Sequence, residues 1–199
     1  LSIEPGTFIY ADLADEHTAP ALIVTQGSKI YAEGTKDQPI VFTSVLDLRN
    51  SLSKEDKGLW GGLIILGHAP INSNKSRNLD NQPLTNSIDG VPDYSNLSNR
   101  SIPQSHLIYG GDNFEDNSGV LKFVSIRHCG AKGSGWGLKG LSLAGIGSKS
   151  TFEHIEVFAT KDDGIDILGG VVSAKYLSVA YSGDDSFDID QGYAGVLQF

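Results

Sequence analysis

The sequence predicts an all-β protein that folds as a right-handed parallel β-helix, a solenoid with rungs of about 21–22 residues. Two observations carry this prediction. The segment from Lys161 to Gly192 contains the same aspartate pattern twice, 22 residues apart, and short apolar strands separated by Gly turns recur along the chain. The segments between these strands lack the 3.6-residue apolar period of a helix, so the repeats are not βαβ units.

The beginning of the chain contains a second repeat. The segment from Ile3 to Tyr10 matches the segment from Val24 to Tyr31 at an offset of 21 residues, with a Gly inside each copy. Each copy is typical of a short strand, a Gly turn and another short strand. We interpret the two copies as equivalent positions on consecutive rungs, and a third strand at 39–44 completes that rung.

The middle of the chain interrupts the solenoid. An apolar run at 59–67 fits a strand buried between two rungs. Residues 68–119 then contain four of the seven prolines and many Asn and Ser residues, which argues against regular structure. We predict a long irregular loop insertion at 68–119 within a single domain, 1–199. It is either a lobe packed on the side of the solenoid or a dedicated binding loop.

From Val120 the alternating pattern returns and fixes the register of three rungs. Apolar residues at every second position face the core, and we expect their neighbours to face solvent. A right-handed solenoid follows from the general preference for right-handed parallel crossovers. The inward pairs are predicted to be Val124/Ile126, Ile155/Val157 and Leu177/Val179 on one side, and Leu141/Leu143, Ile165/Ile167 and Phe187/Ile189 on another.

Composition excludes several kinds of partner. The formal charge of −9 argues against nucleic acid, which needs a basic surface, and no apolar run is long enough to insert into a membrane. The single cysteine, Cys129, cannot form an internal disulfide, and we expect it to be buried.

Because Leu1 and Phe199 both fall in apolar strand-like runs, we expect the chain to be part of a longer protein whose export signal lies outside it.

Six aspartates form a grid on two consecutive rungs. Alternation places Asp166 and Asp188 outward at equivalent positions about 5 Å apart, and two further pairs stack at the turn before each strand. Asp before Gly is good turn chemistry by itself. The grid could also hold a cation, for which the hard oxygen ligands favour Ca²⁺, or raise the pKa of one carboxyl enough for catalysis. The predicted calcium ligands are Asp162, Asp163, Asp166, Asp184, Asp185 and Asp188, and no other cofactor is indicated.

Part of this grid resembles the polygalacturonase-like glycoside hydrolases. Asp163-Gly164, followed by Gly183-Asp184-Asp185 one rung later, is similar to two of that family's catalytic motifs. The resemblance implies that Asp163, Asp184 and Asp185 are the catalytic residues. An acid and a base on neighbouring rungs could supply the geometry of an inverting hydrolase.

A broader resemblance extends over most of the chain. Motifs such as Trp60-Gly-Gly-Leu-Ile-Ile-Leu-Gly67 and Asn117-Ser-Gly-Val-Leu-Lys-Phe-Val124 resemble those of secreted β-helix proteins from Bacteroidota, within the pectate-lyase-like superfold. That resemblance implies export and display on the cell surface, at the outer-membrane side, without an established activity.

We therefore expect an extracellular β-helix with a structural, adhesive or binding role, whose partner is a glycan or another surface protein. One alternative is a polysaccharide hydrolase or lyase that acts on acidic glycans through the aspartate columns. Another is a fibre subunit, since solenoid ends can self-assemble.

Overall fold

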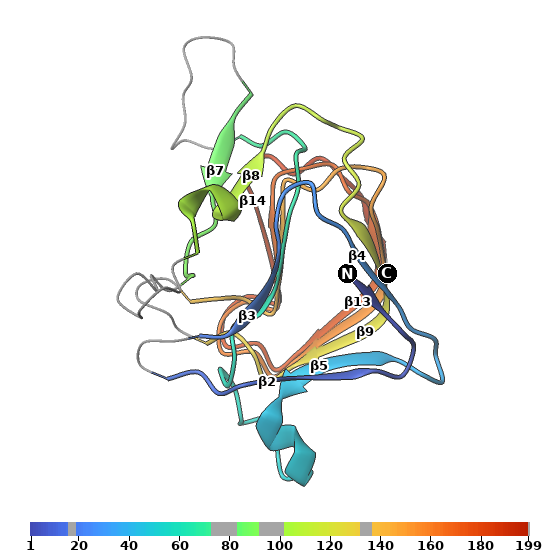
Figure 1. Cartoon of the computed structure of the whole chain (residues 1–199), viewed down its shortest axis with the longest axis vertical. Helices are drawn as coiled ribbons and strands as arrows, with labels where there is room; N and C mark the ends of the chain where they lie inside the picture. Colours follow the sequence, from blue (N-terminus) through green and yellow to red (C-terminus); the bar gives the residue numbers. More distant parts are fainter. Residues whose placement is uncertain (16–18, 73–82, 92–101, 132–136, 199) are drawn as a thin grey trace.

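The computed structural model describes residues 1–15, 19–72, 83–91, 102–131 and 137–198. These residues form a parallel β-helix, which confirms the predicted all-β solenoid. Figure 1 shows the strands stacked behind one another around a common interior.

Two parallel sheets form the walls of the solenoid. The first has the order β1-β4-β9-β11-β13-β15, with β2 and β5 pairing alongside it, and the second has the order β14-β12-β10-β6-β3. The strands of the first sheet are β1 (Ser2–Ile3), β2 (Phe8–Ala11), β4 (Ile30–Glu33), β5 (Ile40–Ser44), β9 (Gly119–Arg127), β11 (Thr151–Phe158), β13 (Ala174–Ala180) and β15 (Leu197–Gln198). Those of the second are β3 (Ala21–Val24), β6 (Gly62–Leu66), β10 (Leu141–Ala144), β12 (Ile165–Leu168) and β14 (Phe187–Asp190).

The register predicted for the last three rungs is confirmed. Val124 pairs with Ile155 and Ile155 with Leu177, so these residues form one column of the core. In the second sheet Leu141 pairs with Ile165, and Ile165 pairs with Phe187. Alternating apolar residues therefore identified the inward face correctly, because a strand's side chains point to opposite sides of its sheet.

The register proposed for the first two rungs is wrong. Ile3 pairs with Ala32, and Phe8 pairs with Val41, so Tyr10 and Tyr31 do not occupy equivalent positions. The matching segments are β1–turn–β2 and β3–turn–β4, which are different corners of the solenoid. Both turns place a glycine at positive φ, +75° at Gly6 and +77° at Gly27. Similar local turn chemistry produced the sequence match, and the match does not reflect the rung period.

The long strands of the first sheet bend around a corner without leaving the ladder. Phe123, His154 and Tyr176 lie at this bend on consecutive rungs, and all three have left-handed backbone conformations, with φ between 48° and 59°. Their rings stack in a column, with centroids 4.3 Å apart for Phe123 and His154 and 4.4 Å apart for His154 and Tyr176. The stacked rings pack the outside of this corner.

The described part of the 68–119 insertion is a lobe with a small sheet of its own. β7 (Thr85–Ser87) pairs antiparallel with β8 (Ile108–Gly110), and the 3₁₀ helix η3 (Gln104–Leu107) leads into β8. Figure 1 shows β7 and β8 outside the wall that contains β14. A second 3₁₀ helix, η1 (Val45–Arg49), follows β5. Residues 73–82 and 92–101 of the insertion lie outside the described residues.

The described residues form two hydrophobic cores. The first fills the solenoid and includes Phe42, Phe152 and the inward pairs described above, except Ile189 on the last rung, which is 49% exposed. The second lies on the outer face of the second sheet, where Ile64 and Leu66 of β6 pack with Leu107 and Tyr109 of the lobe. The lobe therefore buries a face that alternation alone assigned to solvent. Among the described residues, no helix is long and apolar enough to cross a membrane.

Candidate functional site

A cavity of about 270 Å³ lies between the outer face of the second sheet and the lobe. Its sheet side is formed by Ser142, Asp166 and Asp188 on three consecutive strands. Its lobe side includes Tyr109, whose buried hydroxyl accepts hydrogen bonds from Asn86 (3.2 Å) and from Nε2 of Gln191 (2.8 Å). The other lining residues are Ile88, Asp89, Gly137, Leu138, Lys139, Leu168, Asp190 and Gln191. A pocket with several polar groups on a partly apolar wall is the usual form of a small-molecule site.

The carboxyl column on the sheet side follows directly from the register. Ser142 pairs with Asp166, and Asp166 pairs with Asp188, so the three side chains lie on one line along the solenoid axis. Adjacent strands are about 4.8 Å apart. Asp190 lies two residues after Asp188 and therefore points to the same side of β14. The predicted stacking of Asp166 on Asp188 is thus confirmed, but the expectation that both face solvent is wrong for Asp166.

Asp166 is the most unusual group in the cavity. It is only 4% exposed, and its Oδ1 has no hydrogen-bond partner among the described residues. Burial, followed by repulsion from the carboxylate of Asp188, raises the pKa of Asp166 from 3.8 to about 7, against the opposing effect of Lys139. Burial also raises the pKa of Asp188. The covering lobe thus produces two neighbouring carboxyl groups with different exposure to water.

Replacing Asp166 with asparagine is expected to remove a pH dependence of stability. Because its pKa is raised in the folded protein, the wild type loses stability as pH rises from about 4 to about 7. Asparagine does not ionise, so we expect D166N to be up to about 4 kcal/mol more stable than the wild type near pH 8 and about equally stable near pH 4. Urea unfolding at the two pH values measures the difference.

The exposed Asp37 offers a control with the same change of charge. We expect Asp37→Asn to change the free energy of unfolding by less than about 0.5 kcal/mol at either pH. If D166N were less stable than the wild type at both pH values, a folded-state partner of the carboxylate would be indicated instead.

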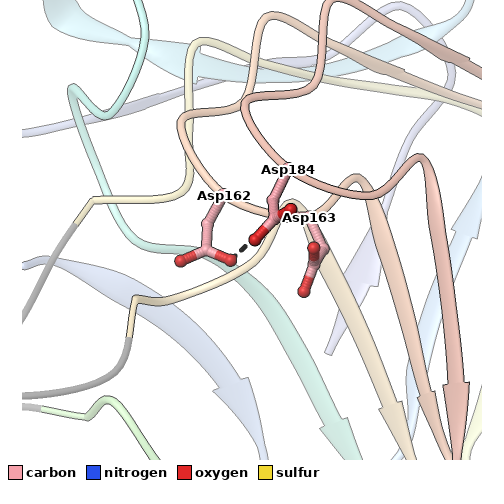
Figure 2. A group of neighbouring side chains, drawn as sticks. All are labelled: Asp162, Asp163 and Asp184. Carbon is pink, nitrogen blue, oxygen red and sulfur yellow. Dashed lines mark hydrogen bonds between the residues drawn. The ribbon is translucent and has the colours of Figure 1, made fainter.

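A second acidic cluster lies beside the cavity, at the turns that precede β12 and β14. Figure 2 shows the carboxyl groups of Asp162, Asp163 and Asp184 gathered there. One oxygen atom from each lies within 4.8 Å of the others. The backbone N–H of Asp185 donates to Oδ1 of Asp163 at 2.9 Å, which ties the two turns together. This part of the predicted grid does assemble.

Lys139 supplies a positive charge to that cluster. Its Nζ lies 2.5 Å from Oδ1 of Asp162 and 2.7 Å from Oδ2 of Asp163. Burial on its own would lower the pKa of Lys139, but the hydrogen bonds to the two carboxylates outweigh it and raise the pKa to about 12. A bound calcium ion at Asp162, Asp163 and Asp184 would therefore share these ligands with an ammonium group. The calcium site stays a prediction.

The residues predicted to be catalytic lie next to the cavity and do not line its described wall. Asp163 is buried and engaged by Lys139, whereas Asp184 and Asp185 are exposed on the following turn. Their catalytic role stays a prediction. The carboxyl groups that do line the cavity are those of Asp89, Asp166, Asp188 and Asp190.

Several residues of the site were missed from the sequence, Lys139 and Tyr109 among them. Lys139 could have been found from the sequence. In the structure the backbone N–H of Gly140 donates to the carbonyl of Asp163, so Lys139 lies one rung before the aspartate pairs. Aligning Leu141 with Ile165, an offset of 24 residues, reveals this equivalence. Tyr109 carries no such signal, since its position depends on how the lobe folds back. Cys129 is buried as expected, and burial raises the pKa of its thiol to about 12.

A family model described as a pectate-lyase-like beta helix domain matches residues 1–199. No curated protein matches the chain. No solved structure matches it either.

Proposed function

The chain belongs to the pectate-lyase-like beta helix domain family, and we propose that it is an extracellular, surface-displayed protein that binds a glycan. The binding site in this proposal is the cavity between the second sheet and the lobe. Family membership is compatible with both binding and hydrolysis, so the choice between them depends on the chemistry of the cavity.

The observation that carries the proposal is the composition of the cavity wall. Ser142, Asp166, Asp188 and Gln191 offer hydroxyl, carboxyl and amide groups, which can donate to and accept from sugar hydroxyls. Tyr109 and Ile88 add an aromatic and an aliphatic side chain to the lining, with exposed fractions of 1% and 7%. A volume of about 270 Å³ is close to the lower end of the range for small-molecule pockets and is suited to one sugar unit of a chain.

We expect a glycan array to identify a ligand, and replacement of Tyr109 by alanine to weaken its binding at least about tenfold. The aromatic wall and two hydrogen bonds to the hydroxyl group are lost in this variant. Isothermal titration calorimetry with the best array ligand measures the change. Alanine at the exposed Tyr31, on the first sheet, is the matched control and should bind like the wild type. Equal binding by both variants would exclude the cavity as the site.

A second candidate function is hydrolysis of a glycosidic bond in the same cavity. It is favoured by the raised pKa of Asp166, about 7, because a carboxyl group that holds its proton near neutral pH can act as a general acid. Asp188, on the next rung, would serve as the base or nucleophile. Incubating the array ligand with the wild type and with D166N, and assaying new reducing ends, separates this function from binding alone. Release by the wild type and none by D166N would support hydrolysis.

A further inference from the structure

The cavity has an imbalance of charge that favours one class of ligand. Asp166, Asp188 and Asp190 line it on the side of the second sheet, and among the described lining residues Lys139 alone is cationic. The ammonium group of Lys139 is already held by two carboxylates of the neighbouring turn. The described wall therefore offers several carboxyl groups and little positive charge to neutralise them. An acidic sugar would be repelled here, and a positively charged one would be attracted.

Asp166 provides a specific place for that positive charge. Its side chain lines the cavity and is buried at 4% exposure, and its Oδ1 has no hydrogen-bond partner among the described residues. A buried acceptor without a donor costs about 1–3 kcal/mol. A ligand group that donates a charge-assisted hydrogen bond to Oδ1 would remove this cost and gain a strong contact.

The geometry favours an organic cation over a metal ion in the cavity. Among the described residues, the group of three or more acidic side chains close enough to share one ion is Asp162, Asp163 and Asp184, which lies on the turns beside the cavity. The cavity is also about 270 Å³, far more than one ion fills. Ser142 remains available for a neutral hydroxyl group.

We propose that the cavity recognises an amino sugar whose protonated amine binds Oδ1 of Asp166, with Asp188 adding to the attraction. This inference rests on the proposed glycan-binding function and names its ligand class. The hydroxyl groups of the same sugar bind the polar wall, and the amine distinguishes the ligand from neutral and acidic glycans.

The test compares three oligosaccharides of equal length in calorimetric titrations: a β-1,4-linked glucosamine oligomer, its fully N-acetylated form and the corresponding glucose oligomer. The N-acetylated oligomer keeps the nitrogen but lacks the charge. We expect the glucosamine oligomer to bind the wild type at least about tenfold more tightly than either other oligomer. The Asp166→Asn variant should lose this preference, and the Asp188→Asn variant should show a smaller reduction of it. The Asp37→Asn variant, a control for the overall charge, should keep it.

The outcomes separate this inference from the function on which it rests. Equal affinities for the three oligomers, with weaker binding by the Tyr109→Ala variant, would support the glycan site and overturn the amine preference. No binding of any glycan by the folded wild type would overturn both. Binding of a simple alkylammonium ion or of a lysine-rich peptide as tightly as the glucosamine oligomer would overturn the assignment to an amino sugar. The same preference in D166N as in the wild type would overturn the role of Asp166.

Discussion

Replacing Lys139 with methionine is expected to lower the free energy of unfolding by about 3 kcal/mol. Methionine keeps most of the volume of the side chain but removes the ammonium group that contacts Asp162 and Asp163. The carboxylate of Asp163 is only 6% exposed, so without Lys139 it would remain buried with an uncompensated charge. Urea unfolding of the variant and the wild type under the same conditions measures the loss.

Lys149 is the matched control for this change. It pairs with Glu115 at 2.9 Å, but both side chains are well exposed, at 58% and 72%. We expect Lys149→Met to cost less than about 1 kcal/mol, because water screens an exposed pair. If the two variants lost the same small amount, Lys139 would not be needed to balance the buried carboxylates.

The Lys139→Met variant also sharpens the calcium hypothesis. In the wild type one carboxyl oxygen from each of Asp162, Asp163 and Asp184 lies within 4.8 Å of the others, and the variant removes the ammonium group that contacts two of them. A cation that binds only the folded state raises the melting temperature. A calcium-dependent rise that is larger in the variant than in the wild type would therefore support this cluster as the ion site.

Replacing Leu66 with alanine is expected to cost about 3 kcal/mol. Leu66 belongs to the outer face of β6, where the lobe covers it completely, with an exposed fraction of 0%. The truncation removes buried methyl groups and leaves a space that the surrounding side chains fill only in part. The midpoint of urea unfolding should fall while its slope stays the same, since the folded shape is kept.

Leu48 in η1 provides the control, because it is 59% exposed. We expect Leu48→Ala to change stability by less than about 0.5 kcal/mol. A similarly small effect of Leu66→Ala would mean that the outer face of the second sheet faces water. The cavity between that sheet and the lobe would then lose its structural basis.

The aspartate columns show how far the sequence predicts the candidate site. The 22-residue repeat correctly stacked Asp166 on Asp188, because equivalent residues of a solenoid lie on one line along its axis. The shorter match at an offset of 21 residues led to a wrong register for the first rungs, because Gly6 and Gly27 lie in similar turns at different corners of the solenoid. Only pairing partners far apart in the chain, such as Phe8 and Val41, distinguish a repeated rung from a repeated turn.

By itself, the sequence determined the solenoid, the inward face of its last rungs and the column of carboxyl groups on the outward face. The tertiary structure decided what that column faces. Alternation reports on which side of a strand a residue lies, but it contains no information about what covers that side. Tyr109 and Ile88 belong to the insertion and lie more than fifty residues from Asp166 in sequence. Alternation assigned Asp166 to solvent, but together with these two residues it forms part of the wall of a cavity. Burial by that lobe, which no local pattern encodes, is the main reason that the pKa of Asp166 rises to about 7.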